Sequence, residues 1–143
     1  AKNPDNTFYI YVKGYLFNRM YENLKGAGKN EEAAAALDQA IETYKKTIEV
    51  NPKYPQALSN LAFSYCLKAQ DYSEKAESDV SSPKYAEDQA ILKGFYESAK
   101  PYYEKVRELY PEQKDLWLQG LYRVYYNLNM GPEFEEIESL MGM

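Results

Sequence analysis

Residues 44–66 read YKKTIEVNPKYPQALSNLAFSYC, and this stretch decides the fold class. Its first part closes a run in which apolar side chains recur every three or four residues, the period of an α-helix. Pro52 ends that helix, because proline lacks a backbone donor and disfavours helical geometry in the residue before it. Pro55 suits the first turn of a following helix. The stretch therefore predicts two helices joined by a tight turn.

A second stretch of the same kind lies near the C-terminus. Residues 103–125 read YEKVRELYPEQKDLWLQGLYRVY, with Pro111 at the place of the turn. Two such corners in a chain of 143 residues predict an array of helical repeats. The alternating pattern of a β-strand is absent from the sequence. We therefore predict an all-α fold, and the length favours a single domain over residues 1–143.

The composition argues against most catalytic and nucleic-acid functions. The net charge is −5, from 17 basic and 22 acidic residues, whereas nucleic acids and anionic membranes attract a basic face. Histidine is absent and Cys66 is the one cysteine, so zinc sites and Ser–His or Cys–His nucleophile systems lack their residues. No run approaches the roughly 18 apolar residues of a membrane span. We predict no catalysis, no cofactor, no metal, no nucleic-acid partner and no membrane insertion.

Glycines and prolines divide the rest of the chain into helices. Asn3-Pro4 suits a helix start, and Asn30 is the expected N-cap of the helix that follows the KGAGKN stretch. Ser82-Pro83 is expected to cap and open a long helix, which Pro101 should kink. We expect helices over residues 7–24, 31–50, 55 to beyond 66, 83–110, 116–128 and from 134 to near the end.

Residues 70–82 read QDYSEKAESDVSS and leave two interpretations open. The helix that begins at Pro55 could run on to about Ala76 as a solvent-exposed extension. Alternatively, Asp71 with Glu74 could cap a separate short helix. The sequence favours the extension.

The repeat pattern resembles the tetratricopeptide repeat (TPR) family. Its signature pairs a first helix bearing large-x-x-Leu-Gly-x-x-Tyr with a second bearing Ala-x-x-x-Phe and a closing proline. The first-helix pattern is matched by Leu58, Leu61, Ala62 and Tyr65. The second-helix pattern is matched twice, by Ala40, Tyr44, Thr47 and Pro52, and by Ala99, Tyr103, Val106 and Pro111. Weaker first-helix matches are Tyr11 with Gly14, and Trp117, Gly120, Leu121 and Tyr125.

This resemblance implies a right-handed array of antiparallel helix pairs, with about two full repeats and a partial third. The pairs are expected at about residues 7–50, 55–110 and 114–141. Pro52 and Pro111 lie 59 residues apart, against a repeat length of about 34. We assign the excess of about 25 residues to an elongated hairpin over residues 66–95. The layout is similar to that of TPR proteins exported by Bacteroidetes-type bacteria, which implies a bacterial, exported or periplasmic protein. The chain starts with Ala1 and not with Met. It could therefore be a processed mature form or a cloned fragment, and the sequence does not separate the two.

The resemblance also implies a binding surface, because the first helix of each pair in this family lines a concave groove that commonly binds peptides. By position, the groove set is Tyr9, Lys13, Leu16, Ser59, Asn60, Phe63, Leu67, Leu118, Tyr122 and Tyr126. The alternative is that the extra tyrosines thicken a thin core or face a neighbouring domain. Some family members clamp a C-terminal carboxylate, but Val12, Leu16, Ser59 and Phe63 hold the corresponding places here. We expect the nearby cations Lys13, Arg19 and Arg123 to be solvated.

The sequence favours one function and leaves two rivals open. The first is a non-catalytic scaffold that binds a partner protein or peptide through the groove. The second is a structural or oligomerisation module, or a fragment of a larger array that packs end to end, and this allows a homo-oligomer. The third is an enzyme or small-molecule binder that uses a pocket beneath the 66–95 extension.

Overall fold

The computed structural model describes residues 4–143, and every regular element in that range is helical. This confirms the predicted all-α fold. The elements are α1 (Pro4–Gly26), α2 (Asn30–Val50), α3 (Pro55–Ser73), α4 (Pro83–Leu109), a 3-10 turn η1 (Lys114–Leu116), α5 (Leu118–Asn127) and α6 (Gly131–Leu140).

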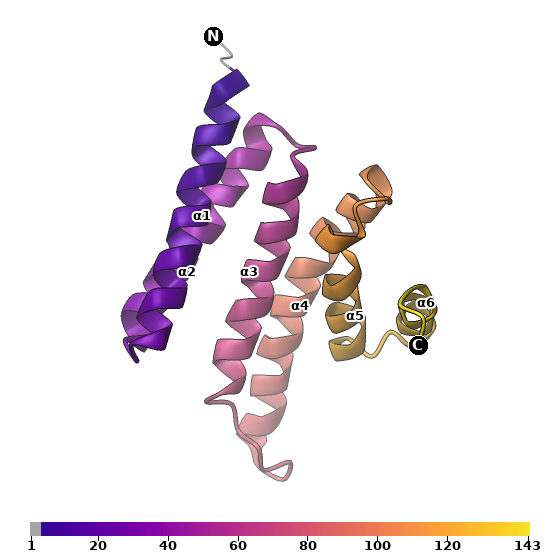
Figure 1. The fold of residues 1–143 in the computed structure, drawn as a ribbon. Helices are drawn as coiled ribbons and strands as arrows, with labels where there is room; N and C mark the ends of the chain where they lie inside the picture. The colour runs from indigo at the N-terminus through magenta and orange to yellow at the C-terminus, as the bar shows by residue number, and fades with distance from the viewer. Residues whose placement is uncertain (1–3) are drawn as a thin grey trace.

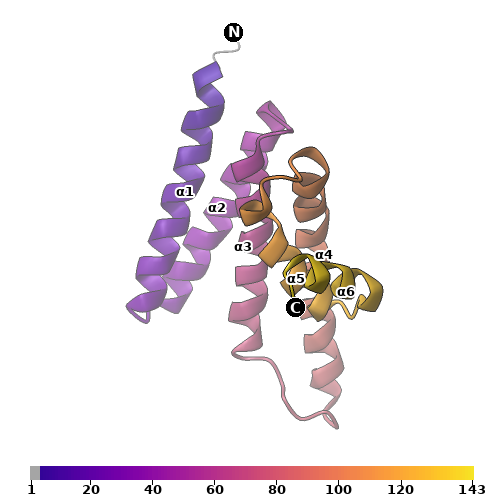
Figure 2. The same cartoon turned by 45° about the vertical axis from the view of Figure 1, so that its right-hand side comes forward.

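The first four helices form two antiparallel pairs, α1 with α2 and α3 with α4 (Figure 1). Contacts between α2 and α3 and between α4 and α5 join each pair to the next, as in a TPR-like array. The last pair differs, because α6 is seen almost end-on in Figure 1 and lies across α5 in Figure 2. Only the first two pairs are therefore antiparallel hairpins.

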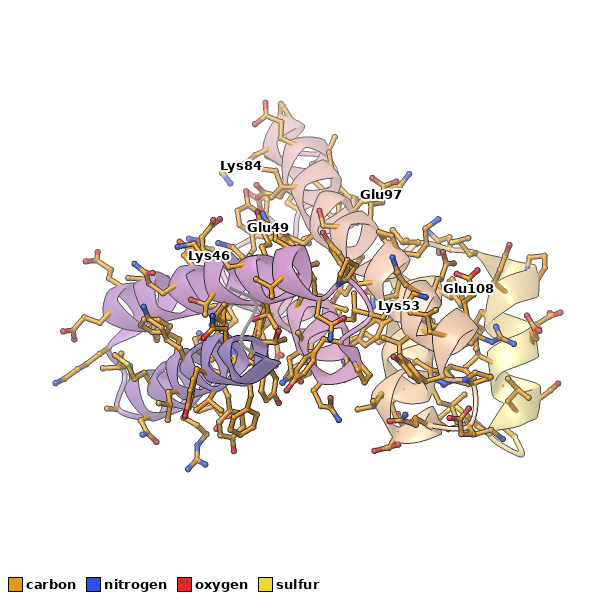
Figure 3. The ribbon with its side chains drawn as sticks, turned by 90° about the horizontal axis from the view of Figure 1, so that it is seen from above. Lys46, Glu49, Lys53, Lys84, Glu97 and Glu108 are labelled. Carbon is orange, nitrogen blue, oxygen red and sulfur yellow. The ribbon has the colours of Figure 1, made fainter. Side chains whose placement is uncertain are left out.

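The helices lie in two layers, with α1, α3 and α5 in one and α2 and α4 in the other. Viewed from above, Lys46 and Glu49 of α2 and Glu97 of α4 point outward from the second layer (Figure 3). The two proline-marked turns lie at the same end of the molecule (Figure 1). They are tied together there, because the Tyr110 hydroxyl donates to the Lys53 carbonyl at 2.6 Å.

Helix α3 belongs to two hydrophobic cores at once. The N-terminal core consists of Tyr21, Ala33, Ala36, Leu37, Ala40, Ile41, Tyr44, Ala57 and Leu61. The C-terminal core consists of Leu58, Ala62, Cys66, Ala99, Tyr103, Val106, Trp117, Leu121, Val124, Tyr125 and Ile137. Consecutive residues of α3 face opposite cores, so this helix joins the two halves of the molecule.

Two glycines allow the closest helix approaches. A Cβ atom on Gly14 would lie 2.7 Å from the ring of Tyr44, and one on Gly120 would lie 2.2 Å from the ring of Tyr103. Carbon atoms are not found so close without a bond, so any side chain there would displace a ring from a close-packed core. Gly14 and Gly120 thus hold the small positions of the repeat pattern.

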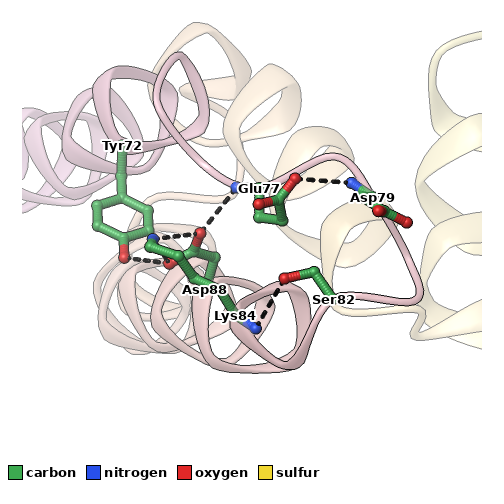
Figure 4. Close-up of polar contacts among 6 residues, drawn as sticks. All are labelled: Tyr72, Glu77, Asp79, Ser82, Lys84 and Asp88. Atoms are coloured by element: carbon green, nitrogen blue, oxygen red, sulfur yellow. Dashed lines mark hydrogen bonds and ion pairs between the residues drawn. The ribbon is translucent and has the colours of Figure 1, made fainter.

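The α3–α4 hairpin is closed at its tip by a buried carboxylate. Helix α3 runs to Ser73, which confirms the extension over a separate short helix, although it ends three residues before Ala76. Asp88 is 1% exposed and accepts hydrogen bonds from the Tyr72 hydroxyl (2.6 Å) and the Glu77 amide (2.7 Å) (Figure 4). The Lys84 ammonium adds an ion pair to Asp88 at 2.8 Å. We call this arrangement the Asp88 clasp; it joins α3, the loop and α4.

Several predicted helix ends are confirmed and others are wrong. Ser82 caps α4 as predicted, since its hydroxyl accepts from the Lys84 amide at 3.2 Å. Asn30 is not an N-cap: it is the first residue of α2, and the preceding residue makes no side-chain cap. The predicted helix over 116–128 begins only at Leu118, because Trp117 leaves helical geometry with φ −139° and ψ −23°. Asn3, the other half of the predicted start, lies outside the described residues.

Helix α1 begins at Pro4 rather than near residue 7, and α4 continues through Pro101 as one helix. Proline at a first helical position costs no hydrogen bond, because the first amides of a helix have no partner within it. Pro101, by contrast, removes one backbone hydrogen bond from the interior of α4.

Candidate interaction groove

The ten predicted groove residues fall into three groups. Tyr9, Lys13 and Leu16 lie on the outer face of α1, where Tyr9 is 66% and Leu16 55% exposed. Ser59 and Asn60 are engaged inside the protein. Phe63 and Leu67 line a hollow between α3 and α5, Tyr122 and Tyr126 line an adjoining hollow on α5, and the half-buried Leu118 packs against the C-terminal core.

The polar groups of Ser59 and Asn60 hold helices together. The buried Ser59 hydroxyl donates to the Leu116 carbonyl at 2.7 Å, which ties α3 to the turn before α5. The Asn60 amide donates to the Tyr11 hydroxyl at 3.1 Å, which ties α3 to α1. These groups therefore serve the fold, and a peptide would have to compete with those bonds to use them.

Three adjoining hollows are lined by residues of α3, α4, α5 and the turn after α5. The three helices are neighbours in the fold (Figure 1). The first, of about 280 Å³, is lined by Phe63, Cys66, Leu67, Gln70, Ser73, Tyr96, Arg123 and Asn127. The second, of about 340 Å³, is lined by Gln119, Tyr122, Arg123, Tyr126 and Asn127. The third, of about 320 Å³, is lined by Ser73, Gln89, Leu92, Lys93, Tyr96, Asn127 and Asn129. Because Asn127 lines all three, we treat them as one surface, the α3–α5 groove.

Arg123 stands at the junction of the first two hollows. Its guanidinium carbon lies 5.8 Å from the centre of the Phe63 ring, within the range of a cation–π contact. On the far wall, Tyr122 packs against Phe134 of α6, with ring centres 4.9 Å apart, and Tyr126 lies 5.7 Å from the same ring. The groove thus combines one cation with a cluster of aromatic rings.

Burial sets the protonation states of the groove's weak acids. Burial raises the pKa of the Cys66 thiol to about 11, although the nearby Arg123 opposes the change. Burial also raises the pKa of the Tyr96 phenol, and this is the largest effect on that group. Both groups are therefore neutral near pH 7, where Tyr96 can donate a hydrogen bond and Cys66 is a poor nucleophile.

Sequence reasoning missed the part of the groove that comes from α4 and from the ends of α3 and α5. Tyr96 and Lys93 come from a second helix, whereas the family pattern places the groove on first helices alone. A signal was present in the spacing of Gln89, Lys93 and Tyr96, which lie at three- and four-residue steps on one helix face. That spacing alone does not show which neighbour the face meets.

A further hollow of about 230 Å³ lies beneath the extension, between α2, α3 and α4. Its lining residues are Ala34, Leu37, Lys68, Asp71, Tyr72, Lys75 and Phe95. Asp71 is the one carboxylate among them, and it is occupied: it accepts from the Tyr21 hydroxyl at 2.9 Å and pairs with Lys25 at 3.0 Å. This hollow therefore offers no pair of acidic groups for general acid–base chemistry.

Across residues 4–143, no three or more His, Cys, Asp or Glu side chains come together in a way that could hold a metal ion. Within the same range, no helix is both long enough and apolar enough to cross a membrane.

Comparison with known proteins bears on the middle of the chain. Residues 36–68 match the family model of the TPR repeat. Over these residues the chain is similar to a TPR repeat. The match begins on the buried face of α2, passes through the Pro52 turn and ends within α3. No curated protein matches the chain. TPR repeats generally mediate contacts between proteins, and their stacked helices provide extended binding surfaces.

Proposed function

We propose that this protein is a non-catalytic scaffold that binds a partner protein or peptide through the α3–α5 groove. The observation that carries the proposal is the line of three adjoining hollows on one surface of a TPR-like array. Aromatic rings supply contact area for an extended peptide, and amide and hydroxyl groups supply hydrogen bonds. The exposed residues Tyr9, Lys13 and Leu16 of α1 would extend this contact along the same layer.

Peptide binding by matched variants tests this proposal. We expect Phe63→Ala and Tyr122→Ala each to weaken binding of a selected peptide on the order of tenfold, as for aromatic residues central to an interface. Val50→Ala is the control, because Val50 is 49% exposed at the end of α2, outside the groove. Since Tyr122 packs against Phe134, thermal unfolding must first show that this variant is folded. Unchanged peptide affinity in both groove variants would show that the peptide does not bind in the α3–α5 groove.

A structural or oligomerisation role is the second candidate, and the outer face of α1 favours it. Phe8, Leu16 and Met20 are 55%, 55% and 48% exposed there. Apolar surface left uncovered at the end of a stacked array invites contact with another array or another copy. Light scattering across micromolar concentrations tests this role, and a strict monomer at every concentration would count against it.

We further propose that residues 1–143 fold as a single domain, because α3 supplies side chains to both cores. The narrower resemblance to exported Bacteroidetes-type TPR proteins is also carried forward as a proposal. Fractionation of a bacterium that expresses the natural gene would test it, and a purely cytosolic product would contradict it.

A further inference from the structure

We infer that the α3–α5 groove recognises a peptide segment bearing an Asp or Glu side chain beside an aromatic or aliphatic residue, with Arg123 as the principal contact. The inference rests on the proposed function and specifies its partner.

The first support is the charge of the groove. None of the residues that line the three hollows is an Asp or Glu, although the whole chain has 22 acidic residues and a net charge of −5. The groove does contain two cations, Arg123 and Lys93. A positive, carboxylate-free groove on an otherwise acidic protein attracts anionic segments of a partner.

The second support is that Arg123 keeps its charge uncompensated. The chain has three arginines; Arg19 pairs with Glu22 at 3.7 Å, and Arg107 pairs with Glu136 at 3.0 Å. Within residues 4–143, Arg123 has no carboxylate oxygen within 4.0 Å. Apart from its contact with the Cys66 thiol, the guanidinium therefore has N–H donors that no carboxylate of the described chain occupies.

The third support is that the Arg123 side chain has a defined position. The guanidinium lies over the Phe63 ring, and a guanidinium can bind a carboxylate through two parallel hydrogen bonds. Restriction of the side chain before binding lowers the entropy lost when the ligand arrives. The neutral Tyr96 hydroxyl and the Gln70 amide line the same hollow and supply further donors, whereas the Asn127 amide donates to the Arg123 carbonyl at 2.8 Å.

The aromatic rings beside Arg123 favour an aromatic or aliphatic residue next to the acidic residue of the peptide. The rings of Tyr122 and Tyr126 line the second hollow, which shares Arg123 with the first. A side-chain carboxylate at Arg123 thus places the next residues of an extended peptide against these rings. Of the four places at which other family members clamp a C-terminal carboxylate, Phe63 lies in this groove, whereas Val12, Leu16 and Ser59 line none of the three hollows.

The experiment starts from a displayed library of short random peptides selected on the whole chain. Selected peptides are made with amidated C-termini, in three forms: with the acidic residue, with the matching Asn or Gln, and with phosphoserine in its place. Binding is measured by calorimetry to the wild-type chain, to Arg123→Gln and to the control Arg19→Gln, which removes an exposed arginine of α1. Thermal unfolding confirms that each variant is folded.

We expect the acidic form to bind the wild type on the order of tenfold more tightly than its amide form. Arg123→Gln should abolish that difference, Arg19→Gln should retain it, and added salt should reduce it.

Equal binding of the acidic and amide forms, or an acidic preference that survives in Arg123→Gln, would overturn the inference. If Phe63→Ala still weakens that binding, the proposed groove function stands on its own. Tighter binding of the phosphoserine form alone would assign the groove to phosphopeptides and likewise overturn the inference. Selection of no peptide at all would overturn both the inference and the proposed function.

Discussion

Tyr103 is buried beneath α5 at the one point where that helix has no side chain, Gly120. Tyr44 meets Gly14 of α1 in the same manner. In both places a large flat ring fills the space that a glycine leaves, so ring and glycine act as one packing unit. The sequence shows these residues at recognisable positions of the repeat, but only the structure shows which ring meets which glycine.

Gly120→Ala should destabilise the protein by about 1–3 kcal/mol, because the new methyl group must push the Tyr103 ring out of a close-packed core. The matched control is Gly94→Ala in the interior of α4, where a Cβ would meet nothing within 4 Å. Alanine is the better helix former, so the free energy of unfolding of the Gly94→Ala control should rise by about 0.5–1 kcal/mol. Chemical denaturation measures both, and equal effects of the two substitutions would contradict the packing argument.

Cys66 should react very slowly with a thiol reagent at pH 7–8. It is 3% exposed, and burial raises the pKa of its thiol to about 11, so the reactive thiolate is scarce. In denaturant the same thiol should react at the rate of a free cysteine. Rapid modification of the native protein would show that the core around α3 opens readily.

Among the elements, the long α3–α4 hairpin departs most from an ordinary repeat, and the Asp88 clasp holds its free end. Lys84, Tyr72 and the Glu77 amide all stabilise the charged form of Asp88, with Lys84 the largest influence, and they lower the pKa of its carboxyl to about 2. The clasp converts nine residues of polar loop, 74–82, into a fixed connection between two helices.

The contribution of the Asp88 clasp to the stability of the folded protein should decrease as the pH falls. The pKa of Asp88 is lower in the folded than in the unfolded chain, where the ordinary value is 3.8, so its stabilising effect is complete above about pH 4. The effect should fade as the pH falls from about 4 toward 2. Asp88→Asn should remove it at every pH and speed hydrogen exchange in residues 74–82, whereas Asp115→Asn, at an exposed carboxylate, should not. Unchanged exchange in Asp88→Asn would mean that the loop is held by other contacts.

Helix identity was largely predictable from the sequence, whereas contacts between elements were not. Pro52, Pro55, Ser82 and Pro83 mark helix ends by local geometry, which depends on each residue and its immediate neighbours. Trp117 was placed inside a helix because its spacing is helical, but it lies between η1 and α5 with φ −139° and its ring is buried. The Lys84–Asp88 pair is visible at four-residue spacing, yet the Tyr72 and Glu77 bonds depend on the loop and could not be foreseen.

The same distinction applies to the candidate site. Phe63, Leu67 and Tyr122 were predicted by position in the repeat, and they line the groove. Tyr96 was missed because its role depends on how α4 lies against α5, which is a property of the tertiary structure. Arg123 was predicted to be a solvated charge; it is exposed, but its guanidinium also lies over the Phe63 ring.

At the scale of the whole molecule, α3 divides the interior into two cores that share one helix. Stability in stacked arrays is approximately a sum of units and of the contacts between neighbours. A destabilised core should therefore affect the other mainly through α3, and through Ile48 of α2 and Tyr102 of α4, which also pack against both cores.

Leu121→Ala and Leu37→Ala test this division, because each removes a fully buried leucine, one from each core. Each should cost about 2–5 kcal/mol. Leu121→Ala should speed hydrogen exchange mainly in α4–α6, and Leu37→Ala mainly in α1 and α2. Equal acceleration throughout the chain in both variants would instead indicate one fully cooperative unit.

Trp117 is the one tryptophan of the chain, and its position gives the C-terminal core an optical reporter. The indole is 2% exposed, lies under the Arg107 guanidinium at 5.1 Å, and is the one buried side chain in residues 4–143 whose nitrogen has no hydrogen-bond partner. Its fluorescence should therefore be blue-shifted in the native state and shift red when α5 leaves the core. Tyrosine emission and circular dichroism sample both halves, so a tryptophan transition that precedes or follows theirs would reveal, without any label, which half of the array separates first.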